Sequence, residues 1–323
     1  MGHLVRTAAI SRAIKSLTGI DALVFIAPGF ANIVSKEIPR LEVIEAPEDP
    51  GAYRKIILER LRSINPRTLV VDALPMGLMG ELRDFLEEFS GRKVLVSRLL
   101  RRDYRQMMKI DDFVRANYDL VIRTEKMPDD ELKHPRSEQV APILVRDSAE
   151  VFTRTEARKK LAVPRRRILV MAVSTHQPSR ADAFFQMVYR AIMRVGYPKG
   201  VVKFASPYGD ADPSSAHTSY FPLMDLLPGV DLLVAGAGYH SVHEANSLGV
   251  PMLAFPEERL YDDQEARVSY FVNINGMTPF HSPQEAEDGL RKFLRSPVPS
   301  RRRKKFISGA HEAAKAILEL HSS

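Results

Sequence analysis

Apolar runs of strand length alternate with helical patterns along the first half of the chain. The runs lie at 22–28, 41–47, 68–75, 93–98, 119–124 and 141–146. Helical patterns cover 52–64 and 80–90 between them, and the chain opens on a helical pattern that no strand precedes. This alternation predicts a parallel sheet covered by helices on both faces, with ligand loops at the carboxyl ends of the strands.

A second series of the same kind begins beyond a charged connection at 147–167, which includes a short helical pattern at 153–161. Its first strands are expected at 165–174 and 200–206, on either side of a long helix at 182–196. A chain of 323 residues is long for one domain. The sequence therefore predicts two α/β, Rossmann-like domains.

The domains are expected at 1–150 and 165–300, each with a doubly wound parallel sheet. The first domain lacks an apolar run ahead of its opening helix, so the pattern predicts no first strand there. An amphipathic pattern at 301–323 predicts a C-terminal helix that crosses back to the first domain.

The segment 231–268 is the most informative part of the chain. It contains an apolar strand, the turn Gly236-Ala237-Gly238, a helix, a second strand and a polar loop. The helix is expected to start near Ser241, with Ser241 and Glu244 forming a capping box. Free N–H groups at a helix N-terminus favour a phosphate ligand, although the glycines could equally serve only close packing of helix and strand.

Composition narrows the class of protein. The chain contains no Cys, which excludes disulfides and thiolate sites, and no apolar run approaches the ~20 residues of a membrane-spanning helix. A soluble, cytoplasmic protein is therefore expected. The net charge of +7 suits anionic partners.

Basic residues gather in three runs, at 98–109, 158–167 and 300–305. They contain few aromatic residues and match no nucleic-acid module, so solvated helix faces are expected and nucleic acid is not an expected partner. With apolar neighbours such as Leu99-Leu100 and Met107-Met108, some of these runs could instead hold the protein on an anionic membrane surface, peripherally on the inner face.

Four segments resemble GT-B glycosyltransferases. GHLVRTAAISRAI and VVDALPMGLMGEL resemble the GHxxR and VDxxPxGxxGEL segments of a family of predicted glycosyltransferases, distantly similar to the N-acetylglucosaminyltransferase that makes lipid II. APILVRDSAEVFTRTEARKKLAVP is similar to the interdomain connection of that family. GAGYHSVHEANSLGVPMLAFP with DDQEAR resembles its donor-site signature. The resemblance implies two Rossmann-like domains facing a cleft.

The resemblance also implies roles for individual residues. Glu244 would hold the nucleotide ribose, Asp263 and Gln264 would touch the transferred sugar, and the diphosphate would lie against Gly236, Gly238, Tyr239 and Ser241. On the acceptor side, it implies His3 as general base, Asp72 as the group that orients His3, and Arg6 as an acceptor ligand. Structural roles remain open for each of them.

The loop VSTHQPSR at 173–180 departs from the family, where glycines bind the donor phosphates. Here Ser174, with Thr175 and His176, would have to donate hydrogen bonds in their place. The expected donor is a nucleotide-diphosphate sugar, with UDP as its carrier, and the acceptor is an unknown hydroxyl, a lipid-linked one being a candidate.

Alternative functions share parts of this pattern. A nucleotide-sugar hydrolase or epimerase would keep the donor site. An NAD-dependent enzyme would use the glycine turn with Glu257 or Glu258, but Ser241 stands where its fingerprint has a third Gly or Ala. No metal-ligand spacing links His217, His240 and His243, so a metal-independent enzyme without a cofactor is expected.

Overall fold

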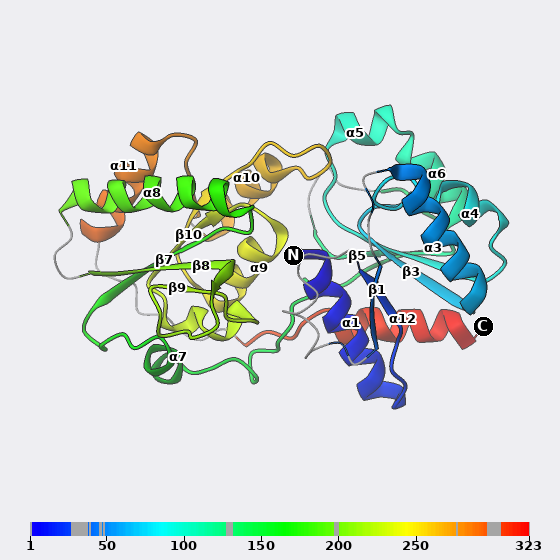
Figure 1. Cartoon of the computed structure of the whole chain (residues 1–323), viewed down its shortest axis with the longest axis horizontal. Helices are drawn as coiled ribbons and strands as arrows, with labels where there is room; N and C mark the ends of the chain where they lie inside the picture. The colour runs from blue at the N-terminus through cyan, green and yellow to red at the C-terminus, as the bar shows by residue number, and fades with distance from the viewer. Residues whose placement is uncertain are drawn as a thin grey trace. The chain divides into compact units, whose positions relative to one another are not determined.

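The computed structural model describes residues 2–26, 38, 40–44, 47, 49–126, 132–196, 200–275, 277–295 and 305–322, without the side chains of 2, 3 and 273–275. The chain divides into two compact units. Unit 1 combines Met1–Val145 with Ser308–Ser323, and unit 2 is Arg146–Ile307 (Figure 1).

Unit 1 is built on a four-stranded parallel sheet in the order β3-β4-β5-β6. The strands are β3 (Thr68–Asp72), β4 (Arg92–Ser97), β5 (Leu120–Arg123) and β6 (Ser137–Gln139). A separate parallel pair is formed by β1 (Val24–Ile26) and β2 (Leu41–Val43). β1 and β2 lie within two of the predicted apolar runs, whose remaining residues fall partly outside the described part of the chain.

Two helices from opposite ends of the chain share one core in unit 1. α1 (Gly2–Thr18) and α12 (Ala310–Ser322) contribute Ala9, Ala13, Ala314 and Ile317 to a cluster with buried residues of β4 and β5 (Figure 1). The small Ala side chains let the two helices approach each other and the sheet closely. The remaining helices are α3 (Pro50–Ile64), α4 (Arg83–Glu88), α5 (Arg102–Met107) and α6 (Ile110–Asn117).

The strand predicted at 141–146 is absent. Pro142 has no N–H to give a sheet ladder, and the segment pairs instead with the start of α12. Ser308 Oγ accepts from Leu144 N at 2.9 Å and donates to Leu144 O at 2.7 Å, while Glu312 accepts from Ala141 N. The apolar run is therefore buried by the C-terminal segment rather than by strand pairing.

Unit 2 contains a six-stranded parallel sheet in the order β12-β11-β10-β7-β8-β9. The strands are β7 (Ile168–Val173), β8 (Gly200–Asp210), β9 (His217–Thr218), β10 (Leu232–Gly236), β11 (Met252–Phe255) and β12 (Thr278–Pro279). In chain order this is a 3-2-1-4-5-6 sheet, the doubly wound arrangement of dinucleotide-binding folds. The winding direction reverses between β7 and β10.

The helices of unit 2 lie on both sides of its sheet (Figure 1). α8 (Pro178–Val195) and α11 (Pro283–Arg295) pack together over a core that includes Val170, Phe185 and Leu290. α9 (Tyr239–Leu248) connects β10 to β11, and α10 (Gln264–Asn275) follows the loop after β11. Two short 3₁₀ helices, η1 (Leu223–Asp225) and η2 (Leu227–Gly229), precede β10.

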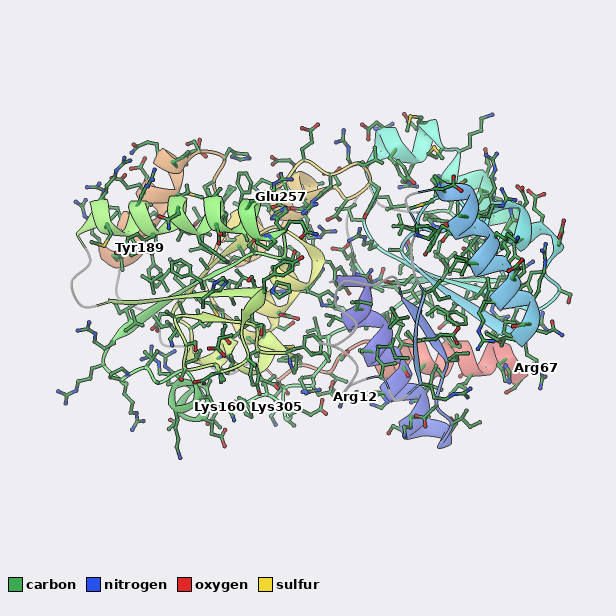
Figure 2. The ribbon with its side chains drawn as sticks, viewed as in Figure 1. Arg12, Arg67, Lys160, Tyr189, Glu257 and Lys305 are labelled. Atoms are coloured by element: carbon green, nitrogen blue, oxygen red, sulfur yellow. The ribbon has the colours of Figure 1, made fainter. Side chains whose placement is uncertain are left out.

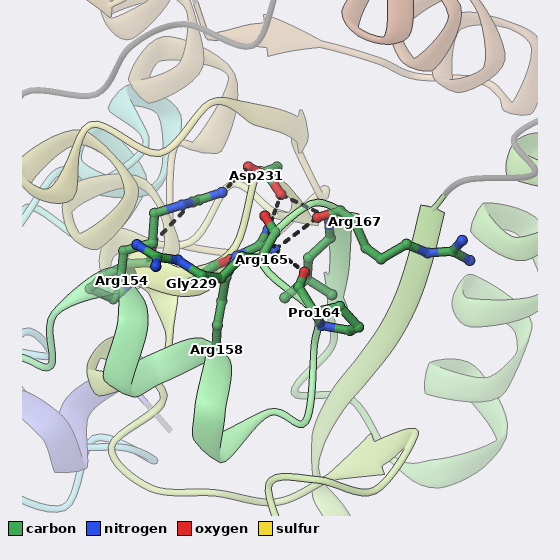
Figure 3. Close-up of polar contacts among 9 residues, drawn as sticks. Arg154, Arg158, Pro164, Arg165, Arg167, Gly229 and Asp231 are labelled. Atoms are coloured by element: carbon green, nitrogen blue, oxygen red, sulfur yellow. Dashed lines mark hydrogen bonds and ion pairs between the residues drawn. The ribbon is translucent and has the colours of Figure 1, made fainter.

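The charged connection belongs to unit 2. Its helix α7 (Arg154–Lys160) starts with a complete capping box between Thr153 and Glu156. Arg158 is 2% exposed and binds Asp231 and the carbonyl oxygens of Gly229, Pro164, Arg165 and Arg167 (Figure 3). Asp231 also accepts from Arg154 and from Leu169 N, so one buried carboxylate fastens the connection to the sheet.

Some residues of the basic runs are buried in the fold and cannot contribute to a surface. Arg158 is a buried structural residue, and Leu99 and Leu100 are buried at 6% and 3% exposure, so they cannot insert into a membrane. Met107 is exposed at 68%. Residues 300–304 of the third run lie outside the described residues. Within the described part of the chain, no helix combines the length and apolar character needed to span a bilayer.

Candidate functional site

Three loops of unit 2 begin at the same edge of its sheet. β10 pairs with β7 on one side, Ala235 opposite Val173, and with β11 on the other, Gly236 opposite Phe255. Because the strands are parallel, the loops beginning at Ser174, Ala237 and Pro256 start side by side at the carboxyl edge. This is also the point where the winding reverses, the usual place for a ligand crevice in open α/β sheets.

The two glycines of the turn are not required by the folded backbone. A Cβ at Gly238 would meet nothing within 4 Å, and one at Gly236 would be in ordinary contact at 3.5 Å. Gly249, by contrast, caps α9 at φ +65, and a Cβ at Gly289 would lie 2.9 Å from Leu253. Close packing of helix and strand therefore does not explain Gly236 and Gly238, and the space at Gly238 is open to a ligand.

The helix after the turn starts two residues earlier than predicted. Gly238 is the N-cap of α9 in extended backbone, and no side chain caps the helix. Ser241 is consequently the third residue of the helix and Glu244 the sixth, so the predicted capping box is wrong. The N–H groups of the first turn, left without a side-chain cap, point out of the helix end towards the open space at Gly238.

Glu244 is buried in the middle of α9, with its side chain 11% exposed. Nδ1 of His240 lies 3.6 Å from Oε1 of Glu244, beyond hydrogen-bond distance. Burial, with the charge of Asp225 as a smaller cause, raises the pKa of Glu244 to about 8. Ionising a carboxyl group in this setting costs stability, which makes Glu244 a candidate for a functional role.

Gln264 and Asp263 open α10 rather than lying free in a loop. Gln264 is 5% exposed, accepts a hydrogen bond from Glu257 N at 3.0 Å and donates to Asp262 at 3.2 Å. Asp263 accepts from Ala266 N, as an N-terminal cap does. Gln264 thus connects the loop after β11 to α10, and the side-chain amide is already engaged with protein groups.

Arg267 was not singled out from the sequence, but it connects two predicted parts of the site. Its fully buried guanidinium donates to Ala237 O at 3.1 Å and to Asp262 at 2.8 Å. The glycine turn is therefore fixed to the Asp-Asp-Gln segment by one cation. In the sequence, the only indication of this contact is that Asp262 precedes Arg267 by five positions.

Ser174 is buried at 5% exposure and directed towards His176, with 3.2 Å between Oγ and Nδ1. On its other side, His176 Nε2 lies 3.0 Å from Glu257 Oε1 and 2.9 Å from Arg259 Nη2. Glu257 follows β11 (Figure 2) and also binds Arg259. The loop after β7 is thus linked by side chains to the loop after β11.

Tyr239 is 2% exposed and packs against the His243 ring, with 4.5 Å between ring centroids, so its ring belongs to the core of unit 2. Ser241 is partly exposed in the first turn of α9. Of the two, only Ser241 is positioned to present its side chain to solvent beside the turn. Among the described residues, no group of three or more His, Asp or Glu side chains could hold a metal ion.

In unit 1, Asp72 ends β3 and binds Arg6 of α1 through both carboxylate oxygens, at 2.8 and 3.0 Å. Arg6 is completely buried, so its guanidinium fastens the start of α1 to the end of β3. His3 lies in the first turn of α1, but its side chain is outside the described residues. Arg6 therefore stabilises unit 1 through its ion pair with Asp72, and the role of His3 stays a hypothesis.

The loop after β3 accounts for the pattern VDxxPxGxxGEL. Glu81 is buried and accepts from Leu78 N at 3.0 Å and Met79 N at 2.8 Å. Gly77 has φ +89, and a Cβ there would lie 2.3 Å from the Glu81 side chain. The loop thereby presents two apolar side chains to solvent, Leu78 at 52% and Met79 at 42% exposure.

No protein-family model matches the chain, and no curated protein matches it significantly. Several solved structures are similar to the chain. MurG of Acinetobacter baumannii is 12% identical with a TM-score of 0.60, over 98% of this chain and 96% of that one. Spinosyn rhamnosyltransferase SpnG complexed with thymidine diphosphate is 14% identical with a TM-score of 0.60, over 98% and 93%.

The glycotransferase of kitacinnamycin is 16% identical with a TM-score of 0.58, over 99% and 96% of the two chains. The three similarities extend over nearly the whole chain. They establish the GT-B fold and confirm the predicted class of two Rossmann-like parallel-sheet units.

Proposed function

We propose that the chain is a glycosyltransferase that moves a sugar from a nucleotide-diphosphate sugar to a hydroxyl acceptor. One observation carries this proposal: a glycine turn that the fold does not require is followed by a buried carboxyl group on the same helix. The fold of glycosyltransferases such as MurG and SpnG supports it.

Glu244 has the chemistry of a ribose ligand. The two oxygens of a carboxyl group can accept hydrogen bonds from two vicinal hydroxyl groups, and a ribose would supply these donors, which the described residues do not give and which favour the ionised form. Helical side chains lean towards the N-terminus, so Glu244 points back towards His240, one turn nearer the start of α9. A nucleoside diphosphate with its ribose at Glu244 would place its phosphates at the N-terminus of α9.

The reaction is a direct displacement at the anomeric carbon of the sugar. The acceptor oxygen forms the new bond, the bond from carbon to the diphosphate oxygen breaks, and the leaving diphosphate is stabilised by the backbone N–H groups after Gly238. A general base takes the acceptor proton, and His3 is the candidate that the resemblance supplies. Ser241 would add a hydroxyl donor for a phosphate oxygen.

The acceptor side is proposed to be unit 1. The Leu78-Met79 pair, held by Glu81 at the carboxyl end of β3, suits an acceptor with an apolar part. A lipid-linked hydroxyl meets that requirement.

Thermal-shift measurements with UDP, GDP, dTDP and NAD test the donor site. The thymidine diphosphate bound to SpnG makes dTDP a necessary member of this set. Stabilisation by one nucleoside diphosphate, lost in Glu244→Gln but kept in the exposed control Glu319→Gln, is the expected result. Stabilisation by NAD alone would replace the proposal with an NAD-dependent enzyme.

A further inference from the structure

A charged cluster at the carboxyl edge of the unit 2 sheet is not explained by the roles assigned above. It consists of His176 on the loop after β7 with Glu257 and Arg259 on the loop after β11. The Glu257 and His176 side chains are 10% and 14% exposed, and Arg259 is 39% exposed. Three ionisable groups are thus held together at the ligand edge.

The carboxylate of this cluster stands beside the glycine turn. The nearest atoms to a Cβ built on Gly236 are Cδ and both oxygens of Glu257, at 3.5 to 3.7 Å. The proposed function places the donor diphosphate at the same turn. An anionic side chain consequently occupies space next to the site where an anionic ligand is expected.

The contacts of His176 conflict with one another. Its Nε2 faces a carboxylate oxygen at 3.0 Å, which requires an N–H, and a guanidinium nitrogen at 2.9 Å, which requires a lone pair. One ring nitrogen cannot satisfy both partners in either protonation state. The cluster therefore has a strained hydrogen-bond arrangement that a different anion could relieve.

We infer that the Glu257 carboxylate occupies the place of the donor diphosphate while the site is empty. The diphosphate displaces this carboxylate when it binds, and Arg259 and His176 then bind the diphosphate. This inference rests on the proposed function. A diphosphate carries more charge and more acceptor oxygens than one carboxylate, so it can bind the guanidinium and the imidazolium separately. The exchange resolves the conflict at Nε2, because this nitrogen can then carry a proton that it donates to the diphosphate.

The inference also accounts for the unusual loop after β7. Ser174-Thr175-His176 lacks the glycines whose backbone N–H groups would approach phosphate oxygens closely. Side-chain cations from two loops can replace those N–H groups, and Glu257 neutralises them while the site is empty. Arg180 on α8 adds a further positive charge that acts on His176.

The charges facing His176 predict how binding depends on pH. Burial lowers the pKa of His176, Glu257 opposes that effect, and Arg259 and Arg180 reinforce it. Replacement of Glu257 by a more highly charged diphosphate favours the protonated ring, so binding should take up a proton. Affinity is therefore expected to fall as the pH rises through the pKa of His176 in the complex.

Calorimetric titration of the full chain with inorganic pyrophosphate and with UDP tests the inference. Glu257→Gln keeps the shape of the side chain and removes its charge, and the neighbouring exposed Glu258→Gln is the matched control. We expect Glu257→Gln to bind both probes roughly tenfold more tightly, with less than twofold change for Glu258→Gln. Arg259→Gln should weaken both roughly tenfold.

Unchanged or weaker binding of pyrophosphate and UDP by Glu257→Gln would overturn the inference. A failure of both probes to bind the wild type and Glu257→Gln would also overturn it. The proposed function fails separately. Tighter binding of pyrophosphate in Glu257→Gln, together with UDP binding that is unchanged in Glu244→Gln, would leave an anion site at which Glu244 does not bind the ribose. Thermal unfolding of each variant without ligand shows that a change in affinity does not reflect loss of the fold.

Discussion

Glu244→Gln should stabilise unit 2 in alkaline solution while it removes nucleotide binding. Burial raises the pKa of Glu244 from its ordinary value of 4.5 to about 8. Ionising this group in the folded state therefore costs up to roughly 5 kcal/mol relative to the unfolded chain. Gln has nearly the same volume and never ionises, so the substitution removes this cost.

The direction of this change in stability with pH follows from the protons bound by the folded and unfolded states. Below about pH 4.5 the carboxyl is protonated in both states, and its ionisation does not affect stability. Between pH 4.5 and 8 the unfolded chain ionises first, so the wild-type protein loses stability as the pH rises, and the loss is complete above pH 8. The part of the Glu244→Gln effect that comes from ionisation is consequently small at pH 5 and largest at pH 9.

A buried amide still needs hydrogen bonds, so the net gain at pH 9 is expected to be about 1–3 kcal/mol. For a unit of this size that corresponds to a rise of roughly 2–10 °C in Tm. Thermal unfolding of the wild type, Glu244→Gln and the exposed control Glu319→Gln at pH 5, 7 and 9 measures it. A difference in Tm that does not grow with pH, or a loss of stability at pH 9, would refute the argument.

Four other substitutions separate structural from functional residues. Gly238→Ala should leave Tm unchanged and weaken binding of nucleoside diphosphates, whereas Gly249→Ala, at φ +65, should lower stability by about 1 kcal/mol without altering affinity; equal effects on Tm would contradict this. Asp231→Asn should lower the free energy of unfolding by roughly 3–5 kcal/mol, measured by urea denaturation, because it leaves buried Arg158 without its carboxylate; a loss below 1 kcal/mol would show the contact to be dispensable. Gly77→Ala should destabilise unit 1 by about 1–3 kcal/mol, since its Cβ would meet Glu81, and a neutral effect in chemical denaturation would count against that contact.

Much of the fold was predictable because its pattern is local. The alternation of apolar runs and helical patterns predicted β3, β7, β10, β11 and the two Rossmann-like units, and the resemblance of four segments predicted the GT-B class. It failed at 141–146, where Pro142 lacks the N–H that a sheet ladder needs and tertiary contacts with Ser308 and Glu312 decide the conformation.

The candidate site was predicted less completely. The glycine turn and Glu244 are readable as a motif, but the capping box was wrong because a Ser-x-x-Glu pattern also occurs inside a helix. Arg267, Arg259 and Glu257 were not assigned to the donor site, since their partners come from loops that only the sheet order brings together. The burial that shifts the pKa of Glu244 is likewise a property of the packed unit.

An experimental structure with the stabilising nucleoside diphosphate bound tests the central claim most directly. We expect the ribose hydroxyls within hydrogen-bond distance of Glu244 and the diphosphate over Gly236 and Gly238, against the first turn of α9. A nucleotide bound elsewhere, or one at this edge with Glu244 still lacking a ligand contact, would contradict the account.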